Sequence, residues 1–170
     1  MRPDFPTRLP KHPLNTALLD YLREQGSPPS GPDDWTLGEW QLHTHPDLMY
    51  RLKDLGLGVP LSAAYGVPLL AYKGVAAALA MGTSALLLRL PKAPADLEEA
   101  RWPFPELTRH GWRAVDAWQS DLRSIEGDHR LLLAVEQALL HTRDLMSQAV
   151  LPLSTTKSVP TTDEASSEAR

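Results

Sequence analysis

Cysteine is absent from the 170-residue chain. Its absence excludes disulfides, thiolate nucleophiles and cysteine-bound zinc, so a metal site would have to use histidines and carboxylates. The chain also lacks any run of about 18 apolar residues that could span a bilayer. Its first residues, MRPDFPTRLPKHP, have no apolar core of the kind found in secretory signals. These absences predict a cytoplasmic protein with no membrane partner.

A basic excess is absent as well. The chain has 17 Lys and Arg against 21 Asp and Glu, which gives a net charge of −4 and a pI near 5.8. Strong non-specific binding to nucleic acid or anionic lipid normally requires a basic surplus, so the charge disfavours both partners. With 42% apolar and 22% charged residues, the composition is that of one ordinary globular domain.

The densest apolar stretch, residues 67–91, predicts a three-stranded meander. Two turn signals, Lys73-Gly74 and Gly82-Thr83-Ser84, divide it into short segments. In the middle segment the alanines at 76, 78 and 80 share one face at period two, and larger residues occupy the other, so a helix could approach the alanine face closely. A short helix over Val75–Met81 is the alternative, because alanine is a strong helix former.

Two helices are predicted before this meander. The first begins with Asn15 as its N-cap and ends at Gly26. The second begins with Thr44 as its N-cap, carries a proline in its first turn, and ends at Gly56.

Three elements are predicted after the meander. They are a short acidic helix over residues 95–101, a strand over residues 112–118, and a long helix that begins with Asp128 as its N-cap and continues to about residue 149.

These elements predict an α+β fold. An antiparallel sheet built on the meander packs against the long C-terminal helix, and two helices precede the sheet. Residues 1–11 form a proline-rich extended arm and residues 12–150 a single domain. Residues 151–170 form a disordered polar tail, because their composition offers too little apolar surface to bury.

The segment HTHPD contains the candidate metal ligands. In an extended segment His43 and His45 point the same way and Asp47 follows, so the three could bind one divalent ion. The segment partly resembles the DxHxH opening of PHP phosphoesterases and the HTHP of JAMM-type metalloproteases. It departs from the first because the nearest preceding acid, Glu39, lies four residues before His43. It departs from the second because Tyr65 stands where an aspartate ligand is required. The alternative is a helix start with surface imidazoles.

A candidate binding surface combines cations with aromatic residues. Cations at strand ends and turns can contact phosphates, and aromatic faces can stack on bases. An aspartate between two tryptophans could have a raised pKa and act as a general acid, although such a residue more often caps a loop or pairs with an arginine. The residues of this candidate surface are Lys73, Arg89, Trp112, Arg113, Asp116 and Trp118.

Four segments resemble the MmcQ/YjbR family and the related N-terminal domain of TfoX. They are YKGVAAALAMGTSALLLRLP (72–91), ADLEEA (95–100), GWRAVDA (111–117) and LLLAVEQALL (131–140). The resemblance covers about residues 65–148 and implies a small α+β fold like that of the iron chaperone CyaY, with a suspected DNA-binding role for its hairpin wings. This chain lacks the basic character that such a role requires, so the resemblance supports fold more than function.

Three functions follow as hypotheses. The leading one is a small cytoplasmic, non-enzymatic binding domain of YjbR-like type, with no cofactor and with a protein or a small ligand as its partner. The first alternative is a hydrolase that uses a divalent metal at His43, His45 and Asp47. The second is a nucleic-acid binder that uses hairpin wings.

Metal content separates the first two hypotheses. The hydrolase predicts a near-stoichiometric divalent metal in the purified, untagged protein, and predicts that the His43→Ala/His45→Ala variant loses it. The binding domain predicts no such metal, even after reconstitution. Elemental analysis of both proteins measures the difference.

Overall fold

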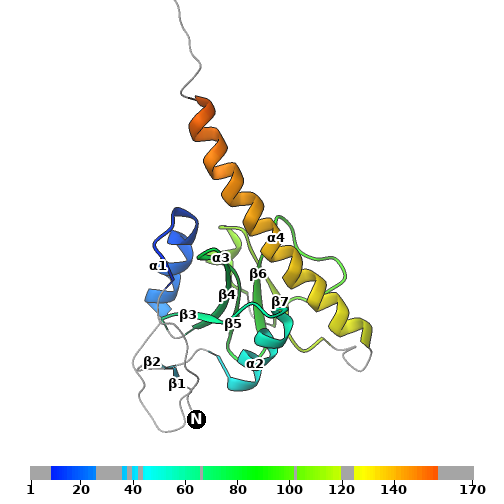
Figure 1. The fold of residues 1–170 in the computed structure, drawn as a ribbon. Helices are drawn as coiled ribbons and strands as arrows, with labels where there is room; N and C mark the ends of the chain where they lie inside the picture. The colour runs from blue at the N-terminus through cyan, green and yellow to red at the C-terminus, as the bar shows by residue number, and fades with distance from the viewer. Residues whose placement is uncertain are drawn as a thin grey trace, which may run out of the picture.

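The computed structural model describes residues 9–25, 36–37, 40–41, 44–65, 67–101, 103–119 and 125–156. Within these ranges, five strands form one antiparallel sheet in chain order (Figure 1). These strands are β3 (Ser62–Ala64), β4 (Val67–Tyr72), β5 (Val75–Met81), β6 (Ala85–Arg89) and β7 (Trp112–Asp116). Two shorter strands, β1 (Thr36–Leu37) and β2 (Trp40–Gln41), pair separately.

The helices within the same ranges are a short 3₁₀ helix and four α-helices. They are η1 (Pro13–Asn15), α1 (Thr16–Gln25), α2 (Pro46–Leu55), α3 (Pro105–Thr108) and α4 (Ile125–Thr156). None of the described helices combines the length and the apolar character that crossing a membrane requires. The elements confirm the predicted α+β class with a C-terminal helix.

The predicted meander lies inside this larger sheet. Strands β4, β5 and β6 pair in sequence, and β3 and β7 extend the sheet at its two sides, so a three-stranded description is incomplete. Residues Val75–Met81 form a strand rather than the alternative short helix. The turn before β5 uses Lys73 at φ 47° and Gly74 at φ 83°, the left-handed pair that suits a two-residue hairpin.

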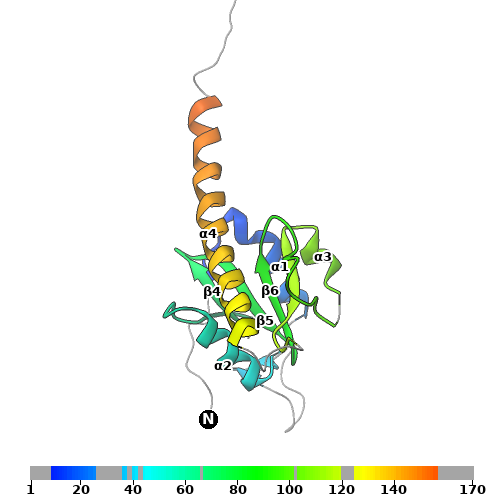
Figure 2. The ribbon, with the colours of Figure 1, turned by 90° about the vertical axis from the view of Figure 1, so that its right-hand side faces the viewer.

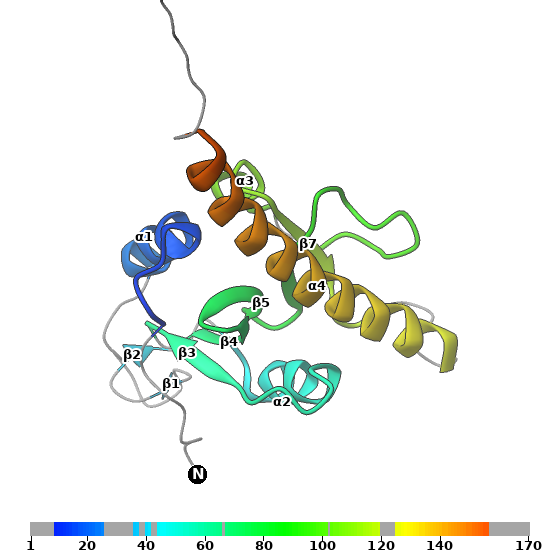
Figure 3. The same cartoon turned by 45° about the horizontal axis from the view of Figure 1, so that its top comes forward.

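Helices cover both faces of the sheet (Figures 2 and 3). On one face α2 and α4 pack against residues such as Leu86 and Leu88 of β6. On the other face α1 and α3 pack against Leu79 of β5 and Leu87 of β6. The C-terminal part of α4 projects beyond the rest of the described molecule (Figures 1 and 2).

The alanines of β5 divide between the two faces. Ala78 and Ala80 belong to the core beneath α4, as predicted, but Ala76 belongs to the core on the opposite face. The cause is a bulge: Leu70 pairs with Ala78 and Ala71 with Ala76, which leaves Ala77 as an extra residue. An extra residue in a strand reverses the alternation of side chains beyond it.

Two predicted caps have other roles. Asn15 lies in η1 and directs its side chain to the sheet instead of to the amides of α1. Thr44 is buried and its hydroxyl donates to the Ala80 carbonyl at 2.5 Å. The N-cap of α2 is His45, whose Nδ1 accepts a bond from the Asp47 amide at 3.1 Å.

The predicted helix over residues 95–101 is wrong. Its residues form a turn followed by a short extended segment, in which Glu99 bridges Val115 of β7. Pairing with an open sheet edge has overridden the local helix signal there. The long helix begins at Ile125 rather than at Asp128 and continues to Thr156, so it includes the first six residues of the predicted tail; residues 157–170 lie outside the described part of the chain.

Part of the predicted N-terminal arm belongs to the core. Leu9 is buried against the face that α1 and α3 cover, and Pro10 packs over Gly74 at the β4–β5 turn. Residues 1–8 of the arm lie outside the described ranges.

The fully buried Asn15 joins this N-terminal segment to the hairpin. Its Nδ2 donates to the carbonyls of Pro10 and Gly74, both at 2.8 Å, and its Oδ1 accepts from the Ala76 amide at 3.0 Å. One amide side chain therefore satisfies three backbone groups that lie far apart in the sequence.

Replacing Asn15 by alanine leaves these three backbone groups without a partner. We expect the free energy of unfolding to fall by about 2 to 3 kcal/mol, the cost of unsatisfied buried polar groups. Urea denaturation monitored by tryptophan fluorescence measures the change. The control is Gln137→Ala on the exposed side of α4, which should stay within about 0.5 kcal/mol of the parent. An equal loss in both variants would contradict the role given to Asn15.

Candidate functional site

The six residues of the predicted binding surface do not share one surface. Lys73 is exposed at the β4–β5 turn. Arg89 and Trp112 are buried, with only 4% and 1% of their surfaces exposed, and this corrects their assignment to a binding face. Strand β7 contains Arg113 and Asp116, and the turn after it contains Trp118.

Arg89 is an interior cation. Its Nε donates to the Ala76 carbonyl at 2.8 Å and its Nη2 to the Leu14 carbonyl at 3.2 Å, and its guanidinium carbon lies 4.4 Å from the Trp112 ring centroid. Burial lowers the pKa of Arg89 to about 10, so the group stays charged at neutral pH. Burial and the Arg89 charge both lower the pKa of His141 on α4. Arg89 therefore fixes η1 to the sheet instead of meeting a ligand at the surface.

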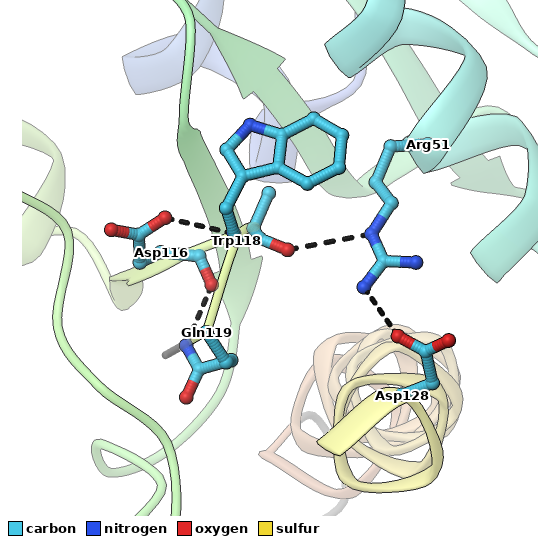
Figure 4. A network of polar contacts seen from close by, with 6 residues as sticks. Arg51, Asp116, Trp118, Gln119 and Asp128 are labelled. Carbon is cyan, nitrogen blue, oxygen red and sulfur yellow. Dashed lines mark hydrogen bonds and ion pairs between the residues drawn. The ribbon is translucent and has the colours of Figure 1, made fainter. Parts of the chain in front are cut away.

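Asp116 caps the turn after β7. Its Oδ1 accepts a bond from the Trp118 amide at 2.8 Å, and its carbonyl accepts one from Gln119 Nε2 at 2.6 Å (Figure 4). Gln119 is buried, and its Oε1 accepts from the Glu98 amide at 2.7 Å. The structure thus shows Asp116 in the loop-capping role that was the alternative to a general acid.

Trp118, 40% exposed, is held in place by a cation. Arg51 of α2 lies with its guanidinium carbon 5.4 Å from the Trp118 ring centroid, and its Nη2 pairs with Asp128 of α4 at 2.7 Å (Figure 4). Arg51 Nε also approaches the Ala117 carbonyl at 3.4 Å. The arginine joins α2, α4 and the turn after β7. Sequence patterns gave no signal for it, because its partners lie 66 and 77 residues away.

The predicted metal segment is only partly described. His45 uses Nδ1 to cap α2 and lies 3.9 Å from the carboxylate of Asp47, which is largely exposed. His43 lies outside the described residues. Among the residues that the structure places, no three His, Asp or Glu side chains form a group that could hold a metal ion.

A pocket of about 360 Å³ lies beside β7, beneath the segment that connects β6 to β7. Its wall is mostly apolar and includes Leu97, Pro103 and Phe104, together with Arg113 and Ala114 of β7. The sequence named Arg113 as a cation of the candidate binding surface, but it gave no signal that Arg113 and Phe104 would line one pocket.

Arg113 is the unusual member of this wall. Its Nη2 donates to the Pro91 carbonyl at 3.0 Å. Its Nε is buried and has no hydrogen-bond partner, the only side-chain nitrogen or oxygen of this kind among the described residues. A buried donor without an acceptor costs free energy, so the Arg113 side chain is held at this wall at an energetic cost.

A second pocket, of about 460 Å³, lies between α1 and α3. Asp20, Glu24 and Glu106 give it an acidic lining, and burial together with Glu106 raises the pKa of Tyr21. Asp20 already pairs with Arg23 at 2.9 Å. This pocket has no buried polar group that lacks a partner, which makes it the weaker candidate.

No family model, curated protein or solved structure matches this chain. The resemblance to the MmcQ/YjbR family therefore stays an expectation drawn from the sequence.

We expect the Arg51–Asp128 ion pair to make a measurable contribution to the free energy of unfolding. Because Arg51 is mostly buried and Asp128 is partly exposed, a double-mutant cycle with Arg51→Ala and Asp128→Ala should give a coupling energy of about 0.5 to 1 kcal/mol, which decreases in high salt. Arg143→Ala, which breaks an exposed pair with its neighbour Asp144, is the control and should change stability little. A coupling of zero at low salt would show that the ion pair does not hold α2 to α4.

Proposed function

We propose that this chain is a non-enzymatic binding module whose ligand occupies the pocket beside β7. The observation that carries the proposal is Arg113, a cation in the wall of a mostly apolar pocket whose buried Nε has no hydrogen-bond partner. Arg89, which is buried in the interior, already donates to two carbonyls and lies against an aromatic ring.

The pocket defines the chemistry of the ligand. An arginine donates to planar anionic groups, above all to carboxylates. Leu97, Pro103 and Phe104 add apolar surface that a hydrocarbon or aromatic group can cover. The ligand we propose combines a carboxylate with an apolar body.

The same residues support binding over catalysis. Arginine stays protonated at neutral pH and acts neither as a base nor as a nucleophile. Glu99, the acidic residue of the pocket wall, is exposed to solvent.

Charge and composition support the rest of the proposal. The net charge of −4 disfavours nucleic acid as the partner, and the absence of cysteine suits a cytoplasmic location. The resemblance to YjbR-like proteins also favours a small binding domain without a cofactor.

Binding of 4-phenylbutyrate tests this function. We expect saturable chemical-shift changes at Ala114 and Phe104 in an NMR titration, and about tenfold weaker binding to Arg113→Gln, because a charge-assisted hydrogen bond is lost. Arg109→Gln, at an exposed arginine outside this pocket, is the matched control and should bind as the parent does. The uncharged analogue 4-phenylbutanol should bind the parent as weakly as 4-phenylbutyrate binds the variant.

Two results would contradict the proposal. The first is the absence of saturable binding by the parent protein. The second is equal affinity of the parent and Arg113→Gln for 4-phenylbutyrate.

A further inference from the structure

Strand β7 is an incompletely covered edge of the sheet. Its register with β6 turns the backbone groups of Trp112, Ala114 and Asp116 away from β6. The segment before α3 pairs with part of this edge: the Ala100 amide donates to the Ala114 carbonyl at 3.1 Å, and the Asp116 amide donates to the Glu98 carbonyl at 3.0 Å.

Within the described ranges, two amides of this edge have no acceptor. The outward-facing amides of Trp112 and Ala114 donate to no residue in the part of the chain that the structure describes. Unpaired amides at a sheet edge are a template for an added strand. Ala114, which carries one of these donors, is also one of the residues that line the pocket.

The cation and the free amide are neighbours in sequence. Arg113, whose buried Nε has no hydrogen-bond partner, and Ala114, whose outward amide has no acceptor among the described residues, both line the pocket. A ligand that satisfies both must carry an anionic oxygen close to a backbone-like carbonyl. A terminal carboxylate meets this condition, because it is attached directly to the main chain that would pair with the strand.

We propose that the ligand of this site is the C-terminal end of an extended peptide with an apolar last residue. In this arrangement Arg113 binds the terminal carboxylate, the Ala114 amide donates to a peptide carbonyl, and the last side chain packs among Leu97, Pro103 and Phe104. Added strands gain affinity from main-chain bonds and specificity from side-chain pockets. The inference rests on the proposed binding function and names its ligand class.

The size and position of the pocket agree with such a ligand. A volume of about 360 Å³ lies near the lower end of the range for small-ligand sites. Only the last residue and its immediate neighbour would be enclosed, and the rest of the peptide would lie along the surface. A free small carboxylate would leave the Ala114 amide without its partner.

The test uses the full chain and a pool of fluorescein-labelled pentapeptides that end in Leu, Phe or Val. Fluorescence anisotropy should show saturable binding of peptides with a free C-terminus and about tenfold weaker binding of the same peptides with an amidated C-terminus, because the charged acceptor is lost. Arg113→Gln should abolish this preference for the free acid, whereas Arg109→Gln should retain it.

Hydrogen exchange reports on the second contact without a mutation that could disturb folding. The bound peptide should slow exchange of the Ala114 amide at least tenfold, and 4-phenylbutyrate should not. Exchange of the Ala100 amide, which is already bonded to β7, is the internal control and should change less.

The outcomes separate the two proposals. If 4-phenylbutyrate binds through Arg113 but the free-acid peptides bind no better than their amides, or leave Ala114 unprotected, the peptide inference is overturned and the binding function stands. If neither probe binds, both are overturned. Arg113-dependent binding of the free acid together with protection of Ala114 supports the inference.

Discussion

The burial of β5 on both faces is the constraint on which the fold depends. All seven residues from Val75 to Met81 are buried, so the strand is stable only if helices exclude water from both sides of the sheet. The chain meets this requirement with α2 and α4 on one face and α1 and α3 on the other. With both faces covered, the sheet meets solvent and partners mainly at its edges, and the candidate site lies at the edge formed by β7.

The buried polar groups explain why Arg113 differs from the rest of the interior. Asn15 and Arg89 are deep in the molecule, yet each is bonded to backbone groups that would otherwise lack partners. Arg113 donates one bond to Pro91 and keeps a buried Nε–H with no acceptor. Among the described residues it is the single buried side-chain nitrogen or oxygen without a partner, and it belongs to a residue that lines a pocket.

The sequence was informative where local rules decide structure. Turn glycines and alternating apolar residues predicted the strands of the meander, and prolines and glycines placed α2 within a residue or two. It did not predict features that depend on contacts between segments far apart in the chain. Arg89 was predicted at the surface, but it is buried because two carbonyls and the Trp112 ring compensate for the loss of water around its charge. The acidic residues before α3 were predicted to form a helix, but they pair with β7. Arg113 was named as a binding residue, but its pocket depends on residues such as Phe104 that no sequence pattern joins to it.

The chain-order pairing of the sheet also bears on how the molecule assembles. Each strand pairs with the strand before it in the chain, and apart from the longer connection between β6 and β7 the loops are short. Topologies dominated by such local pairings fold rapidly. Helix α4 follows the whole sheet in the chain, so until α4 has been synthesised only α2 covers the sheet face that includes Leu86 and Leu88. Until then the apolar residues of this face that α4 covers are exposed, and exposed apolar surface favours aggregation.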